Sequence, residues 1–178
     1  PFGYTARQTN LVDWYAYISP YQGGWLINNP GYFGEHEVSE SADFVVDVTL
    51  VNPPSGLVLA ASAPASPIAS GYHYEMQAAR SFALSASLQY QVASGIAMLA
   101  DGRSITVTHY GSPFVAGMAP QVISDTVRAV ELFSELFAPY PHDQLSVVQA
   151  DFLDGMEYDG LFFLSNGFYN TYAGLPDD

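Results

Sequence analysis

The chain has 178 residues, of which 49% are hydrophobic, so it can bury one sizeable core or two small ones. It contains no cysteine, which excludes disulfides, thiolate metal sites and a cysteine nucleophile. Its formal net charge at pH 7 is −14, and it carries four Arg and no Lys side chains. Nucleic-acid binding requires positive charge against the phosphates, so this composition argues against a nucleic-acid partner.

No segment is long and apolar enough to span a bilayer, and no signal peptide is recognisable at the N-terminus. Pro1 is not expected to be the native start of the protein. Few charges together with abundant Ser, Ala, Tyr and Gly favour an extracellular or cell-envelope protein. The acidity itself indicates solubility or, alternatively, attraction of cationic peptides.

The first half of the chain has the patterns of β-structure. An apolar, β-branched run over 43–51 ends at the turn sequence 52–56, and a second strand is expected over 57–61. Apolar and polar residues then alternate over 72–78 and again over 82–90, which is the period of a half-buried strand. Together these segments predict an antiparallel β-sandwich.

The second half changes pattern after Ser94-Gly95, which we interpret as a boundary between residues 1–93 and 94–178. A strand is predicted over 104–110. Pro120 then opens a helix with apolar residues at helical spacing, which Pro139 and Pro141 end. Strands are expected over 144–150 and 161–165, with a loop over 151–160 that contains two glycines. This order predicts an α+β unit.

One motif stands out in that loop. Gly155, Met156, Glu157 and Tyr158 precede the apolar run 161–164. The motif resembles the Gly-x-Met-Glu-Asn signature of the M1 family of zinc aminopeptidases, which are gluzincins, in its Gly-Met-Glu-Tyr form. The context agrees in order and spacing, because a helix ending in Phe-Ala-Pro-Tyr-Pro and a strand lie directly upstream.

The resemblance has implications for the fold. Residues 1–93 would be the C-terminal part of the family's N-terminal β domain, in which Arg80 to Ser87 resembles the closing strand. Residues 94–178 would be the first sheet-and-helix part of its thermolysin-like catalytic domain, incomplete in this chain. The motif would form an edge strand of that domain.

The resemblance also implies roles for the motif. Glu157 would bind the free α-amino group of a peptide substrate, because a charge-assisted hydrogen bond is short and directional. Gly155 would allow close approach of the backbone, and Met156 and Tyr158 would line the cleft. The alternatives are a loop glutamate at a turn and packing roles for Met156 and Tyr158. Asp154 departs from the small residue usual in the family, and could narrow the cleft, shift specificity or mark an inactive member.

The family's zinc motif, His-Glu-x-x-His, is expected past the end of this chain. His36 and Glu37 begin like it, but Glu40 occupies the place of the second histidine. We therefore expect zinc in the parent protein, no metal site in this chain and no activity of the chain alone. His73, His109 and His142 lack metal-ligand spacing and are interpreted as ordinary histidines.

The acidic residues Asp151, Asp154, Glu157 and Asp159 cluster in sequence. Paired carboxylates could serve glycoside hydrolysis, and clustered oxygens could bind calcium, although the spacing is not that of an EF-hand loop.

The leading interpretation is a fragment of a zinc metallopeptidase of aminopeptidase type, which contributes recognition of a peptide substrate with a free N-terminus. The alternative is a binding or scaffolding module from a catalytically inactive M1-like protein. A third interpretation is an unrelated secreted β-sandwich with an appended helix.

Overall fold

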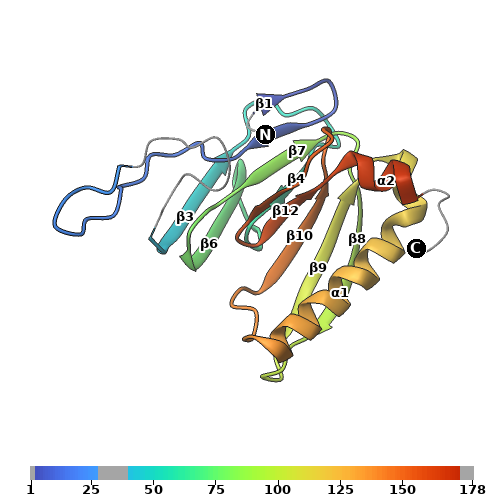
Figure 1. Ribbon diagram of the computed structural model, residues 1–178. Helices are drawn as coiled ribbons and strands as arrows, with labels where there is room; N and C mark the ends of the chain where they lie inside the picture. Colours follow the sequence, from blue (N-terminus) through green and yellow to red (C-terminus); the bar gives the residue numbers. More distant parts are fainter. Residues whose placement is uncertain (1–2, 28–39, 173–178) are drawn as a thin grey trace.

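The computed structural model describes residues 3–27 and 40–172 of the chain, and Figure 1 shows their arrangement. The strands of the first half are β1 (Gly3–Tyr4), β2 (Thr9–Leu11), β3 (Ala42–Thr49), β4 (Val58–Ala61), β5 (Ser66–Ile68), β6 (Gly71–Ala79) and β7 (Leu84–Ser87). The second half contains β8 (Gln91–Met98), β9 (Ser104–Gly111), the 3-10 helix η1 (Pro113–Met118), α1 (Ala119–Leu136), β10 (Gln144–Gln149), β11 (Met156–Tyr158), β12 (Leu161–Leu164) and α2 (Asn166–Tyr172).

The first seven strands form two antiparallel sheets, with the orders β1-β2-β7-β4 and β3-β6-β5. Alternation along β6 buries Tyr74 and Met76. These side chains pack against Phe82 and Leu84 in a core between the two sheets. The predicted antiparallel sandwich is therefore confirmed.

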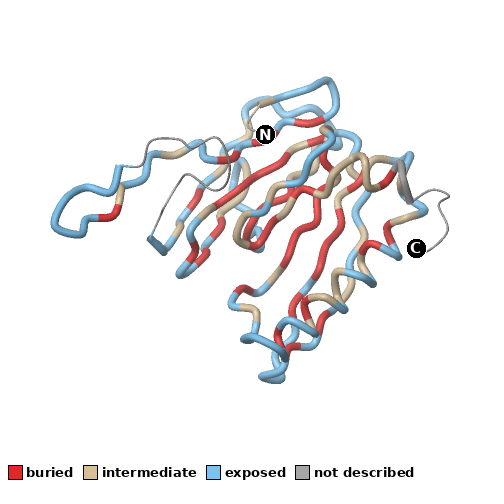
Figure 2. The backbone as a smooth tube through the Cα atoms, in the orientation of Figure 1, coloured by how far each residue is buried: buried red, intermediate tan, exposed pale blue. Residues whose placement is uncertain are grey.

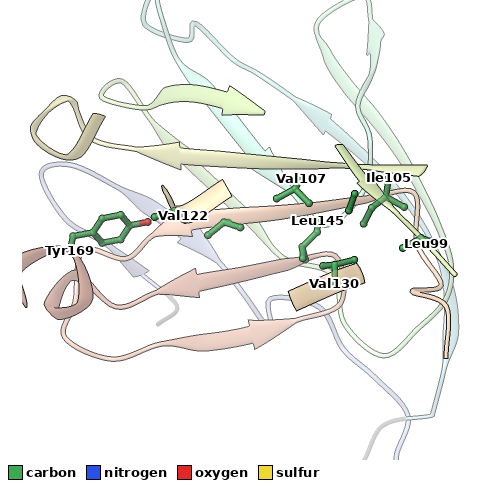
Figure 3. Packing of buried hydrophobic residues seen from close by; sticks show 9 residues of the cluster. Leu99, Ile105, Val107, Val122, Val130, Leu145 and Tyr169 are labelled. Carbon is green, nitrogen blue, oxygen red and sulfur yellow. The ribbon is translucent and has the colours of Figure 1, made fainter. Parts of the chain in front are cut away.

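The remaining strands form a mixed sheet with the order β11-β12-β10-β9-β8. Strands β9, β10 and β12 are parallel to one another, and β8 and β11 run antiparallel at the two edges. Helix α1 connects β9 to β10 and packs on β8 and β9. Figure 3 shows the core on this face, in which Val122 and Val130 of the helix belong to one buried cluster with Val107 and Leu145 of the sheet.

The small sheet β1-β2-β7-β4 is the middle layer of the molecule. Ala60 and Ala83 belong to a core shared with β10 and β12 of the five-stranded sheet. Their neighbours Ala61 and Leu84 belong to the core shared with β3 and β6. Successive residues of a strand point to opposite faces, so Ala60 and Ala61 bury the end of β4 on both sides. Figure 2 shows that the buried residues concentrate in the strands at the centre of the molecule.

The expected fold class is thus confirmed: an antiparallel two-sheet unit is followed by a mixed sheet with a long helix. Two local expectations were wrong. The sequence pattern predicts a loop over 151–160, but this segment includes strand β11, the edge strand that the resemblance implies. The strand expected over 82–90 is confined to β7. The division into 1–93 and 94–178 stays a prediction, and its boundary lies within β8. Among the described residues, no helix has the length and hydropathy that a membrane span requires.

Candidate functional site

The motif residues lie on an edge strand. β11 pairs with β12 alone, with Glu157 opposite Phe162 and Met156 opposite Phe163. The opposite side of the β11 backbone has no strand beside it in the part of the chain that the structure describes. A free strand edge presents N–H and C=O groups to which an extended peptide can bind.

Alternation along β11 separates the motif side chains. Met156 and Tyr158 are half-buried and pack against the core between the sandwich and the five-stranded sheet. The Tyr158 ring meets Phe163 edge-on, with ring centroids 6.2 Å apart. Glu157 is exposed and points to the opposite face, because successive side chains of a strand alternate. The contacts of Met156 and Tyr158 within the described residues agree with the packing alternative, and their roles toward a substrate stay predictions.

Gly155 precedes the strand at a close approach of two backbones. A Cβ at this position would lie 3.2 Å from the carbonyl oxygen of Phe163. This glycine therefore allows the chain to pass close to β12. Asp154, the departure from the family pattern, is exposed, and its Oδ1 accepts a hydrogen bond of 2.9 Å from the Gly155 N–H.

Strands β11 and β12 are joined by the two-residue turn Asp159-Gly160. An Asp-Gly pair between strands is a strong hairpin signal, and sequence reasoning missed it here. Asp159 Oδ2 accepts hydrogen bonds from the backbone N–H groups of Arg80 at 2.6 Å and Ser81 at 3.1 Å. The hairpin that carries Glu157 is thus tied to the antiparallel sheets.

Burial alone would raise the pKa of Asp159, but His142 and the two backbone donors outweigh it and hold the pKa below its usual value. Nε2 of the buried His142 lies 3.7 Å from Asp159 Oδ1.

Asp151 also has a structural role. It forms an ion pair with Arg7 and accepts a hydrogen bond of 2.6 Å from the Thr5 hydroxyl, so it fixes the N-terminal segment to the end of β10. The acidic residues therefore lie in different environments. Within residues 3–27 and 40–172, no three His, Asp or Glu side chains form a group that could hold a metal ion.

His73 lies between two carboxylates, with Nδ1 2.6 Å from Asp47 Oδ1 and Nε2 3.1 Å from Glu75 Oε1. Hydrogen bonds to Asp47 and then Glu75 raise its pKa. His109 is buried, and its Nε2 lies 2.8 Å from the hydroxyl of Tyr169 on α2. Burial lowers the pKa of His109 to about 4, so this ring is neutral near pH 7. His36 lies outside the described residues.

An apolar groove of about 690 Å³ runs beside α1 on the face of the sheet to which Glu157 points. Phe133 and Phe137 of the helix region form one wall, and Phe162, Leu164 and Phe168 form the other. Helix α1 packs on β8 and β9, so Phe162 and Leu164 on the same face of β12 line this groove and are only half-buried.

No protein-family model matches the chain, and no curated protein matches it. Its fold is similar to solved structures of a two-domain M1 zinc metallopeptidase variant. For that variant bound to L-tryptophan, the TM-score is 0.53 and the identity 20%, over 72% of this chain and 32% of the other. For the variant bound to L-arginine, the TM-score is 0.53 and the identity 18%, over 76% and 34%. The chain thus spans about a third of these proteins, and the likeness concerns the fold.

Proposed function

We propose that the chain is part of an M1-type zinc aminopeptidase, in which the edge strand β11 recognises the free N-terminus of a peptide substrate. One observation carries the proposal: Glu157 is exposed on a three-residue edge strand that has no strand on its outer side within the described residues. The fold likeness to M1 zinc metallopeptidases supports the same assignment.

The chemistry of recognition follows from that position. An extended peptide adds to a free strand edge through backbone hydrogen bonds, which hold it in register but do not select its terminus. A carboxylate beside the edge supplies the selection, because an ammonium group donates charge-assisted hydrogen bonds to it. Glu157 would therefore fix the position of the N-terminal amino group of a bound peptide.

Zinc, which the fold likeness implies for a parent enzyme, finds no ligand set among the described residues. No catalytic step through the metal is therefore assigned to this chain. Its proposed contribution is substrate binding, and its catalytic partners would belong to the rest of the parent.

The apolar groove beside α1 supports the view that the chain is one part of a larger protein. Parallel strands are normally covered on both faces, and the groove leaves Phe162 and Leu164 half-buried on one face of β12. Further structure of the parent would cover them.

The test is made in the parent enzyme, with matched peptides that carry either a free or an acetylated N-terminus. We expect Glu157→Ala to reduce cleavage of the free peptide by roughly one to two decades in kcat/KM. This corresponds to the loss of a charged hydrogen bond worth about 1.5–3 kcal/mol. The kcat/KM of Glu157→Gln for the free peptide should lie between those of Glu157→Ala and the native enzyme, because glutamine keeps a hydrogen-bond acceptor and loses the charge.

The control is Glu135→Ala, which removes an exposed glutamate from α1. It should leave both substrates unaffected. If Glu157→Ala lowers stability and leaves the preference for a free N-terminus intact, the glutamate is structural and the proposal is wrong. If the parent binds peptides and cleaves none, the scaffolding alternative replaces it.

A further inference from the structure

The turn of the β11–β12 hairpin is fastened to the antiparallel sheets by two adjacent residues. The side chain of Asp159 accepts hydrogen bonds from the backbone of Arg80 and Ser81, and its own N–H donates to the Ser81 hydroxyl at 2.9 Å. Asp159 thus engages the segment between β6 and β7 through both its side chain and its backbone. These contacts span 78 and 79 positions of sequence.

Gly160 completes the attachment. Its φ of +70° lies in the left-handed region, and a Cβ there would come within 1.9 Å of the carbonyl oxygen of Ser62. Its own carbonyl accepts a hydrogen bond of 2.8 Å from the N–H of Ser146 on β10. The turn is therefore held between the middle sheet and the five-stranded sheet.

The edge strand has few contacts within its own sheet. β11 has three residues and one neighbouring strand. Its N-terminal approach is bonded at Asp151 and Phe152 and is exposed over 153–155. The anchored point nearest to Glu157 is therefore the turn, because Asp159 is two residues beyond Glu157 and one beyond Tyr158.

We propose that Asp159 is a positioning residue, which fixes the edge strand β11, and with it Glu157, against the antiparallel sheets. This inference rests on the proposed function for the role of Glu157. It predicts that loss of the Asp159 contacts loosens the hairpin locally while the rest of the fold persists, because the cores of the sheets contain none of these polar groups.

The first test is hydrogen exchange on the 178-residue chain itself. Local opening exposes amides of the loosened element without exposing those of the core. In Asp159→Ala, the β11 and β12 amides that bond each other should exchange roughly tenfold faster or more, as expected for losing hydrogen bonds to a charged group. The amides between β8 and β9 should be unchanged.

Two further variants serve as a partial rescue and as a control for the hydrogen-exchange result. Asp159→Asn keeps one acceptor oxygen and should restore part of the protection. Asp125→Asn removes the same charge from the exposed surface of α1 and should change nothing. Equal acceleration in all strands would identify Asp159 as a general stabiliser, and unchanged exchange in β11 would remove the anchor altogether; either result overturns the inference.

The second test is a double-mutant cycle in the parent enzyme, with the preference for free over acetylated N-termini as the measured quantity. Asp159→Asn should lower this preference several-fold in the native background and add nothing in the Glu157→Ala background, because both changes act through one carboxylate. If Glu157→Ala lowers the preference and Asp159→Asn does not, the inference alone fails. If Glu157→Ala has no effect, the proposed function fails first.

Discussion

At Gly160 any larger residue would collide with neighbouring backbone unless that backbone shifts. The Gly160 backbone has a left-handed conformation, and the carbonyl oxygen of Ser62 occupies the place where a Cβ would lie. Gly102 has a comparable φ of +85°, but a Cβ there would meet no atom within 4 Å. A substitution at Gly102 would therefore cause backbone strain alone, whereas one at Gly160 would cause both strain and a steric clash.

We expect Gly160→Ala to lower the free energy of unfolding by about 3 kcal/mol, since left-handed strain and overpacking each cost about 1–3 kcal/mol. Gly102→Ala should cost about 1–2 kcal/mol through strain alone. Chemical denaturation of the two variants measures the difference. Equal losses would show that the turn relaxes away from Ser62 without cost.

At the scale of elements, the β3–β6 pair carries a small charged cluster. His73 on β6 lies directly opposite Asp47 on β3, and its ring also contacts Glu75. Hydrogen bonds to Asp47 and Glu75 raise the pKa of His73 above its ordinary 6.5. A raised pKa in the folded state means that the protonated ring stabilises the fold.

This stabilisation should be fully present below about pH 6.5, the pKa of histidine in an unfolded chain, and be lost as the pH rises through the raised pKa. The denaturation midpoint of the native chain should therefore exceed that of His73→Gln near pH 5.5 and approach it at alkaline pH. In Asp47→Asn the same comparison should show a weaker pH dependence. A difference that grows with pH would contradict the assignment.

At the scale of the whole molecule, the middle sheet sets the spacing between its neighbours. Ala60 and Ala61 are both buried, one toward each adjoining sheet. Small side chains on both faces let three sheets stack closely, because protein interiors are packed without spare volume. The two halves of the chain therefore share a core through this layer.

Ala60→Leu should force the middle sheet and the five-stranded sheet apart and cost about 1–3 kcal/mol through overpacking. Ala42→Leu, at an exposed position of β3, should stay within about 0.5 kcal/mol of the native chain. Thermal or chemical unfolding, followed through the tryptophans and through far-ultraviolet dichroism, measures both. Tolerance of Ala60→Leu would mean that the layers are not in firm contact.

Alternating patterns predicted the strands of the sandwich, and Pro120 and Pro139 bracketed the helix. Strand β8 escaped prediction because its larger apolar residues, Val92 and Ile96, are exposed, whereas smaller ones such as Ala97 face inward. The sequence pattern places Gly95 at a boundary, yet a Cβ there would lie 2.5 Å from the Ile123 side chain, so this glycine allows α1 to pack closely on β8.

The candidate site also has one part that the sequence predicts and one part that only the folded structure shows. The motif around Glu157 is contiguous in sequence, and its edge strand could be anticipated from a resemblance. The role of Asp159 depends on the backbone of Arg80 and Ser81, whose distance in sequence leaves no local pattern. Contacts of this kind become visible only when the chain has folded.

The exposed edge at β11 has a consequence for self-association. A strand edge that can accept a peptide can equally accept the same edge of a second molecule. Two copies paired through β11 would bring their Glu157 carboxylates together, on chains that each carry a net charge of −14. The two carboxylates would repel each other, and dissolved salt would weaken that repulsion. Glu157, which is proposed to bind a positively charged N-terminus, would therefore also disfavour pairing of two copies of the chain through β11.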